Sequence, residues 1–259
     1  MELISMEQRG DVVLLGLNRP DKRNAISDRV IEALDAAITK AEETAKAGVI
    51  FGHGQHFSAG LDLAEHVHKT PMEGVHGSRR WHQVFDRLYR GKLPWVAALH
   101  GAVVGGGLEL ASSAQIRVAD ESAFFALPEG QRGIFVGGGA SVRTARLIGA
   151  ARMGDMMLTG RSIDAAQAES WGLAQYVTEA GGAVEKAAQL AAQAATNAPI
   201  SNYAIIHALP RIQDMANDDG LFVESFIASF TSTSPEAEAR LNAFLSKKAG
   251  SKVSRPKGD

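Results

Sequence analysis

The amino-acid sequence predicts an α/β fold followed by a helical C-terminal part. Two observations carry this prediction. Short apolar runs alternate with stretches of helical periodicity up to about Asp164, and the pattern beyond that point is mostly helical. The chain has 259 residues, 45% hydrophobic and 22% charged, which suits a globular protein with a sizeable core. We therefore expect one α/β core with a helical extension.

The first strand is predicted by the apolar run from Val12 to Leu17. The segment Asn18-Arg19-Pro20-Asp21 follows it and ends the strand, because proline cannot continue a ladder. Ser27 is a suitable N-cap for a helix that reaches about Lys46. Its apolar residues recur at helical spacing: Val30, Leu34, Ile38 and Ala41.

The same alternation continues along the chain. Gly48 to Phe51, Val96 to Leu99 and Ile116 to Ala119 are each predicted as short strands, and a helix is predicted to begin near Gly106. Residues 64–80 contain glycines and Pro71 among histidines and charges, without a clear period. This pattern predicts a mobile loop, and such loops often border a site.

Helical periodicity dominates the C-terminal part, and residues 250–259 form a polar tail with Gly, Pro and Lys. The predicted helices are Ala183 to Thr196, Ile200 to Ile212, Leu221 to Thr231 and Glu236 to Lys248. One of them carries an apolar stripe formed by Phe222, Phe226, Ile227 and Phe230. This stripe either packs on the protein's own core or contacts another subunit.

Composition excludes several classes of function. The formal net charge is -2, so no strong field draws the whole protein to nucleic acid or to an anionic membrane. The chain has no cysteine, which excludes disulfides, a thiol nucleophile and thiolate metal sites. No apolar run reaches about 18 residues, and the N-terminus shows no leader pattern. We expect a soluble cytoplasmic protein.

Two glycine clusters are candidate ligand sites: Gly105-Gly106-Gly107 and Gly137-Gly138-Gly139. Glycine lets a backbone approach a ligand closely, although close packing between backbone elements explains such clusters equally well. A dinucleotide-binding loop at the second cluster fails, because Val142 stands where the third glycine of that fingerprint is needed. The histidines at 53, 56, 66 and 68 lack a supporting ligand set, so we expect no metal site.

The most specific signal is an ordered set of motifs spread along the chain. They are Asn18-Arg19-Pro20, Arg23-Asn24-Ala25, Phe57-Ser58-Ala59-Gly60-Leu61-Asp62-Leu63, His100-Gly101, Gly105-Gly106-Gly107-Leu108-Glu109, Phe125-Ala126-Leu127-Pro128-Glu129, Leu158-Thr159-Gly160 and Trp171-Gly172-Leu173. Together they resemble the enoyl-CoA hydratase/isomerase (crotonase) family over nearly the whole chain. The resemblance implies a crotonase-like spiral of ββα units over residues 1–182. It also implies a helical trimerisation region over residues 183–259, giving a homotrimer or a hexamer built as a dimer of trimers.

The resemblance also implies a catalytic site. The carbonyl oxygen of an acyl-CoA thioester would lie between the backbone N–H groups of Leu61 and Gly106. Such donors stabilise the negative charge that develops on this oxygen during reaction. Glu109 would hold and deprotonate a water molecule, and Glu129 would supply a proton to Cα. Retention of both glutamates favours water addition, which gives a 3-hydroxyacyl-CoA from a 2-enoyl-CoA.

Further residues are implied for the CoA moiety, while no metal and no separate cofactor are expected. They are Lys22, Arg23, Ala25, Ala59, Leu61, Asp62, Gly106, Lys247 and Lys248, the last two reaching a neighbouring subunit's ligand. Two departures from the family pattern are Ala64, where a basic residue is common, and Val136, where proline is common. The alternatives are another acyl-CoA reaction of this fold, namely isomerisation, thioester hydrolysis or hydration coupled to C–C or C–S cleavage, and RNA binding without catalysis.

Overall fold

The structure is a computed structural model that describes residues 2–66 and 70–246. It divides into two compact units, Met1–Thr196 and Asn197–Asp259. The first unit therefore extends past residue 182, where the sequence analysis placed the end of the core. Its last helix, α8 (Ala183–Ala195), packs against strands of the central sheet.

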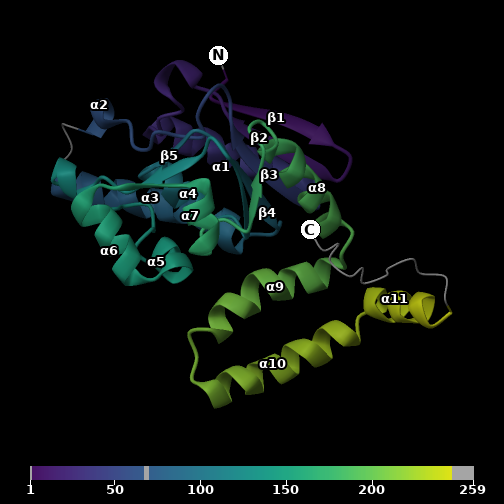
Figure 1. The fold of residues 1–259 in the computed structure, drawn as a ribbon. Helices are drawn as coiled ribbons and strands as arrows, with labels where there is room; N and C mark the ends of the chain where they lie inside the picture. Colours follow the sequence, from purple (N-terminus) through teal and green to yellow (C-terminus); the bar gives the residue numbers. More distant parts are fainter. Residues whose placement is uncertain (1, 67–69, 247–259) are drawn as a thin grey trace. The chain divides into compact units, whose positions relative to one another are not determined.

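In the described part of the chain, the first unit is built on a six-stranded sheet (Figure 1). Its strands, in spatial order, are β1 (Ile4–Arg9), β2 (Val12–Leu17), β3 (Ala47–Gly52), β4 (Trp95–Leu99), β6 (Ile116–Asp120) and β9 (Tyr176–Thr178). β1 runs antiparallel to β2, and the pairings from β2 to β9 are parallel. All six residues of β2 are buried, as expected for a strand covered on both faces.

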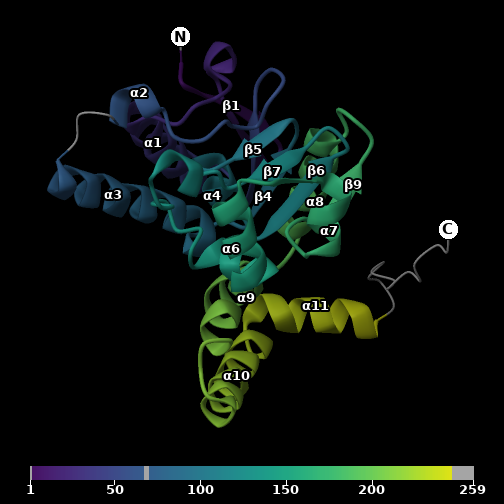
Figure 2. The ribbon, with the colours of Figure 1, turned by 60° about the vertical axis from the view of Figure 1, so that its left-hand side comes forward.

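Helices cover both faces of this sheet, and alternate strand residues face each side. Val12, Leu14, Val49 and Val96 pack with the alanine-rich face of α8. The odd-numbered residues of β2 pack on the other side with α1 (Asp28–Thr44) and α3 (Pro71–Arg90). Figure 2 shows α8 on one side of the strands and α3 on the other. The even and odd positions of one strand thus contribute to two separate hydrophobic clusters.

A second sheet and several short helices complete the first unit. Among the described residues, this sheet has three strands, β5 (Ala102–Val104), β7 (Phe124–Ala126) and β8 (Ser162–Asp164). The short helices are η1 (Pro20–Lys22), α2 (Leu63–His66), α4 (Gly106–Ala111), η2 (Gly130–Arg132), α5 (Arg143–Ile148), α6 (Ala150–Thr159) and α7 (Ala165–Ser170).

The strands and helices predicted in the core are present, with small shifts at their ends. Ser27 caps α1 as predicted, its side chain accepting a hydrogen bond from the Val30 amide, and all four predicted apolar positions of α1 are buried. The prediction of a loop over residues 64–80 was wrong, because α3 begins at Pro71. Thr70 and Glu73 form a capping box, and Trp81, Val84, Phe85 and Leu88 anchor the helix in the core.

The second unit consists of the helices α9 (Pro199–Ile212), α10 (Asn217–Ser232) and α11 (Pro235–Leu245). The predicted helices at 200–212 and 221–231 lie inside α9 and α10. The last predicted helix corresponds to α11, and Lys247 and Lys248 fall outside the described residues. In the described part of the chain, no helix combines the length and apolar character that crossing a membrane requires.

Candidate active site

Two backbone amides meet at the centre of the first unit. Leu61 forms a parallel bridge with Ile26, in which Gly60 O accepts from Ile26 N and Asp62 N donates to Ile26 O. The neighbours of Leu61 therefore make the bridge, and the Leu61 N–H points away from it. Gly106 is the first residue of α4, so its N–H has no acceptor within the helix. Both residues line the same cavity.

The glycines around these amides are required by close contacts. Gly60 has φ +91, and a Cβ there would lie 2.6 Å from Val104 O. A Cβ on Gly106 would lie 2.8 Å from the Trp81 ring and 3.4 Å from Leu61 N. These distances place the two amide-bearing segments side by side. The first glycine cluster therefore allows close packing between backbone segments, and its member Gly106 also lines the cavity.

Glu109 lies on α4 and is 4% exposed. Its Oε1 accepts hydrogen bonds from Gly138 N at 2.7 Å and from Ala140 N at 3.0 Å. Burial raises the pKa of Glu109, while the Ala140 and Gly138 amides and the charge of Arg143 act in the opposite direction. The second glycine cluster, together with Ala140, therefore donates hydrogen bonds to a carboxyl group of the protein itself, that of Glu109.

Glu129 follows β7 and is 5% exposed. Within residues 2–66 and 70–246, its Oε2 has no hydrogen-bond partner. Burial, with a smaller contribution from the charge of Glu109, raises the pKa of Glu129 to about 7. A Cβ on Gly105 would lie 2.8 Å from Glu129 Oε1, so a glycine there makes room for this carboxyl group. The two glutamates thus have unequal environments: one oxygen of Glu109 accepts from two amides, whereas one oxygen of Glu129 has no partner among the described residues.

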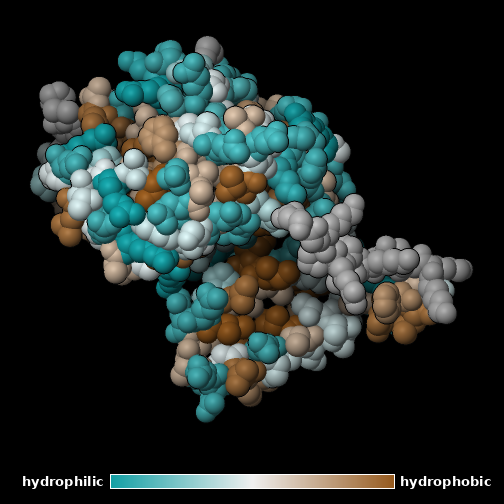
Figure 3. All heavy atoms as spheres, viewed as in Figure 1, coloured by the Kyte–Doolittle hydropathy of each residue, from teal (hydrophilic) through white to brown (hydrophobic). Residues whose placement is uncertain are grey.

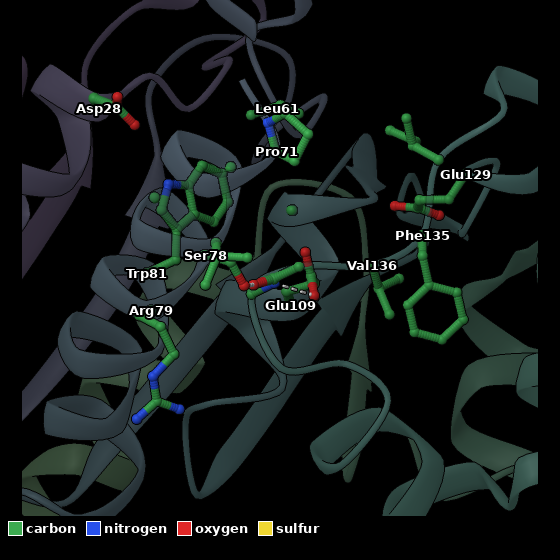
Figure 4. A pocket seen from close by; sticks show the side chains of 17 residues that line it. Asp28, Leu61, Pro71, Ser78, Arg79, Trp81, Glu109, Glu129, Phe135 and Val136 are labelled. Atoms are coloured by element: carbon green, nitrogen blue, oxygen red, sulfur yellow. Dashed lines mark hydrogen bonds between the residues drawn. The ribbon is translucent and has the colours of Figure 1, made fainter. Parts of the chain in front are cut away.

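Both glutamates and both amides line one cavity of about 510 Å³ (Figure 4). Its other walls come from the first half of α3 and from the segment between η2 and α5. The side chains of Trp81, Phe135 and Val136 contribute apolar surface. Val136, one of the departures from the family pattern, is 9% exposed and belongs to this wall.

The structure brings the predicted CoA residues of two distant segments together, next to this cavity. Ala59 N donates to Arg23 O at 2.9 Å, and the Arg19 guanidinium donates to Ala25 O at 2.8 Å. Lys22 and Arg23 are exposed, as contacts with phosphate groups require. Ala64, the other departure, is also exposed and provides no cation. None of Lys22, Arg23, Ala25, Ala59 or Asp62 lines the cavity itself.

Asp62 has a defined structural partner. Its Oδ2 pairs with Arg19 Nη2 at 3.1 Å, and both side chains are largely buried. This ion pair joins the segment before α1 to the segment that carries Leu61. The sequence analysis placed Arg19 in a turn and in a family motif but did not predict this ion pair, because its partner Asp62 lies 43 residues away in the sequence.

The segment before α1 also contains Asn24, whose side chain is buried. Its amide nitrogen donates to the carbonyls of His53 and His56, and its Oδ1 accepts from Arg19 N. Its backbone is left-handed with φ 53, a conformation that asparagine tolerates better than most residues. Among the described residues, no group of His, Asp or Glu could hold a metal ion.

Sequence reasoning also missed Ser78 and Arg143. Ser78 lay in the segment predicted as a loop, and the Arg143 side chain reaches back to Gly138, five residues earlier. The available signal was an arginine shortly after a glycine cluster. The burial of this arginine is visible only in the structure.

A cavity with two backbone amides and two buried carboxyl groups has the groups that acid-base chemistry at a polarised carbonyl group requires. The sequence profile of the enoyl-CoA hydratase/isomerase family matches residues 7–251. The chain therefore belongs to this family, and its fold is the crotonase fold.

Individual relatives agree with this assignment. A crystal structure from Rhodopseudomonas palustris, which carries a provisional enoyl-CoA hydratase name, matches with a TM-score of 0.92 and 49% identity over 95% of each chain. The 2,3-dehydroadipyl-CoA hydratase of Escherichia coli is 34% identical over 95% of this chain and 96% of its own. An enoyl-CoA hydratase of Mycobacterium tuberculosis is 31% identical over 94% of both chains.

Proposed function

We propose that this protein is an enoyl-CoA hydratase, which adds water reversibly and with syn geometry to a 2-enoyl-CoA. One observation carries the proposal: two buried carboxyl groups with different environments line the same cavity as Leu61 and Gly106, whose backbone N–H groups donate no hydrogen bond among the described residues. Water addition to a conjugated thioester needs a base for the water, an acid for Cα and stabilisation of the enolate oxygen. The residues of this site can supply all three.

The roles follow from the environments of the groups. Leu61 N–H and Gly106 N–H would donate to the thioester oxygen, where negative charge grows as water attacks Cβ. Glu109 has one oxygen fixed by two amides, which leaves its other oxygen to hold the water and accept a proton. Glu129, with a pKa of about 7, retains a proton in a large fraction of molecules at neutral pH and can deliver it to Cα.

The first prediction is that the protein hydrates short enoyl-CoA thioesters. Crotonyl-CoA should lose its conjugated enoyl absorbance, and the 3-hydroxy product formed in heavy-oxygen water should carry one labelled oxygen. A panel of short, medium and carboxylate-bearing enoyl-CoAs, with enzyme heated to unfolding as control, would establish the range. Failure with every member of the panel would show that the proposal is wrong.

Product analysis separates this reaction from its alternatives. A double-bond isomerase gives no labelled hydroxyl group, a thioester hydrolase releases free CoA, and cleavage after hydration shortens the product. RNA binding without catalysis is less consistent with a net charge of -2. Salt-sensitive RNA binding by a chain that turns over no acyl-CoA would support it.

We also propose that the second unit assembles the protein into a trimer or a hexamer. Phe222, Phe226 and Phe230 of α10 are exposed by 66%, 60% and 64% within the single chain. Ile227 lines a groove between α9 and α10 with Tyr203 and other apolar residues. Figure 3 shows hydrophobic surface gathered over these two helices. Apolar surface of this extent marks an interface between proteins.

The second prediction concerns this assembly. Phe226→Lys should shift the protein toward the 27.4 kDa single chain in light scattering, because a charge then lies in the apolar stripe. Glu224→Lys is the matched control, since position 224 lies about 200° around the same helix from position 226.

Truncation before Ala243 should weaken assembly and also CoA binding, if Lys247 or Lys248 reaches a neighbour's ligand. A fully active single chain of the unaltered protein would contradict both parts.

A further inference from the structure

The second glycine cluster is held from two sides. Its amides at Gly138 and Ala140 donate to Glu109 Oε1, as described above. Its carbonyls accept from side chains: Ser78 Oγ donates to Gly137 O at 2.6 Å, and Arg143 Nη1 donates to Gly138 O at 2.9 Å. Two consecutive carbonyl groups of the segment are thus fixed by side chains, while two of its N–H groups are bonded to Glu109.

Arg143 is the buried member of this arrangement. Its side chain is 7% exposed, and its Nη2 pairs with Asp86 Oδ1 of α3 at 3.3 Å. Its guanidinium lies over the Tyr89 ring, 5.3 Å from the centroid. The two nitrogens therefore bridge the glycine segment to α3, a geometry that a planar guanidinium supports and a single ammonium group does not.

Gly139 shows how closely this bridge is packed. Its φ is +109, and a Cβ at this position would overlap the Arg143 guanidinium. Gly138 faces the other partner, because a Cβ there would lie 3.1 Å from the Glu109 carboxyl carbon and from Oε2. The segment has room for the Arg143 bridge on one side and the Glu109 carboxylate on the other only because it is made of glycine.

We infer that Arg143 is a positioning residue for Glu109: it fixes the Gly137–Ala140 segment so that two amides hold one carboxylate oxygen and leave the other free toward the cavity. Arg143 also places a positive charge near a carboxylate that has lost its hydration. Both effects favour the ionised form of Glu109. The role of Arg143 in hydration rests on the proposed function, whereas the effect of Arg143 on Glu109 does not.

Several charged groups surround this pair and must be considered in any titration. Glu129 faces Glu109 across the site, and Asp86 and Tyr89 face Arg143 from α3. His82 of α3 also lies within the field of Arg143, and burial together with that charge lowers its pKa. A substitution at Arg143 therefore has to be compared with one that changes the same neighbours without touching the glycine segment.

Arg90 offers this matched control. Its Nη2 bonds Asp86 Oδ2 at 2.7 Å and its guanidinium lies 5.9 Å from the Tyr89 centroid, so it shares both partners of Arg143. Arg90 is exposed, and among the described residues its partners Asp86 and Tyr89 belong to α3 itself. Arg90→Met removes a charge beside Asp86 and Tyr89, as Arg143→Met does, but leaves the bond to Gly138 O in place.

The experiment measures the Glu109 pKa directly by ¹³C NMR of protein labelled at the glutamate carboxyl carbons, with Glu109→Gln assigning the signal. Arg143→Met should raise this pKa by about one unit, Arg143→Lys by less, and Arg90→Met by less than about 0.2 unit. The amides of Gly138 and Ala140 should exchange with solvent roughly tenfold faster in Arg143→Met. If Arg143→Met does not fold, Arg143→Lys decides by the same two measurements.

Turnover provides a separate measurement. With crotonyl-CoA, Arg143→Met should lower kcat about tenfold and change KM less than about threefold. It should also move the acid limb of the pH profile of kcat to higher pH. Arg90→Met should leave kcat, KM and this limb unchanged. An unchanged Glu109 pKa with unchanged amide exchange would overturn the inference, whatever the turnover. If no enoyl-CoA is hydrated, the NMR and exchange results still decide the inference, and only the proposed function fails.

Discussion

Glu109→Gln should lower kcat for hydration by about 10² to 10⁴ while leaving the affinity for a CoA ligand within severalfold. The reason is the fixed orientation of the group. The Gly138 and Ala140 amides need an acceptor, so the carbonyl oxygen of a glutamine must face them. Its NH₂ group then points toward the cavity, where a donor that cannot take a proton replaces the base.

Stopped-flow absorbance with crotonyl-CoA would give kcat, and calorimetric titration with a saturated acyl-CoA would give affinity. Glu121→Gln is the matched control, because it makes the same change at an exposed glutamate outside the cavity lining. If Glu109→Gln retained more than about a third of the unaltered turnover, its assignment as the base would be wrong.

Glu129→Gln should cause a loss of similar size, about 10² to 10⁴, for a different reason. Glutamine keeps a donor toward the cavity but cannot release a proton to Cα. The pH profile distinguishes this role from that of Glu109. Glu129 acts in its protonated form, so kcat/KM of the unaltered protein should fall as pH rises through about 7, where the free protein loses that proton.

The residual activity of Glu129→Gln should lack this alkaline limb, since the group that titrates is gone. Product formation would be followed by chromatography across the pH range, with butyryl-CoA binding as the measure of an intact site. An alkaline limb that persisted unchanged in Glu129→Gln would assign the titration to another group. A variant with near-normal turnover would show that Glu129 is not the acid.

Much of the core was accessible from sequence because each signal was local. The run from Val12 to Leu17 is a buried strand with those bounds, and Ser27 with its apolar positions at helical spacing defines α1. The site residues Leu61, Gly106, Glu109 and Glu129 were identified by family motifs, not by periodicity. The structure adds that these residues, distant in sequence, line one cavity.

What sequence reasoning missed depends on tertiary contacts. In α3, Gly74 and Gly77 suggested a loop, and the capping box formed by Thr70 and Glu73 was overlooked. The buried residues of this helix begin only at Trp81, so its first part has no apolar period to detect. For Arg143 the sequence offered only the nearby glycine cluster, because the burial of its side chain and its ion pair with Asp86 of α3 depend on the fold.

The two halves of α3 differ in how strongly they are held, and this affects the wall of the cavity. From Pro71 to Arg80 no residue is buried, and the interior glycines each cost roughly 1 kcal/mol of helix stability relative to alanine. From Trp81 onward, four buried side chains tie the helix to the core. Local opening therefore takes less free energy in the first half than in the second. The first half of α3, which lines the cavity, can loosen and re-form while the half bearing Asp86 stays in place, so the bridge from Arg143 to Asp86 can persist when the bond from Ser78 to Gly137 O opens.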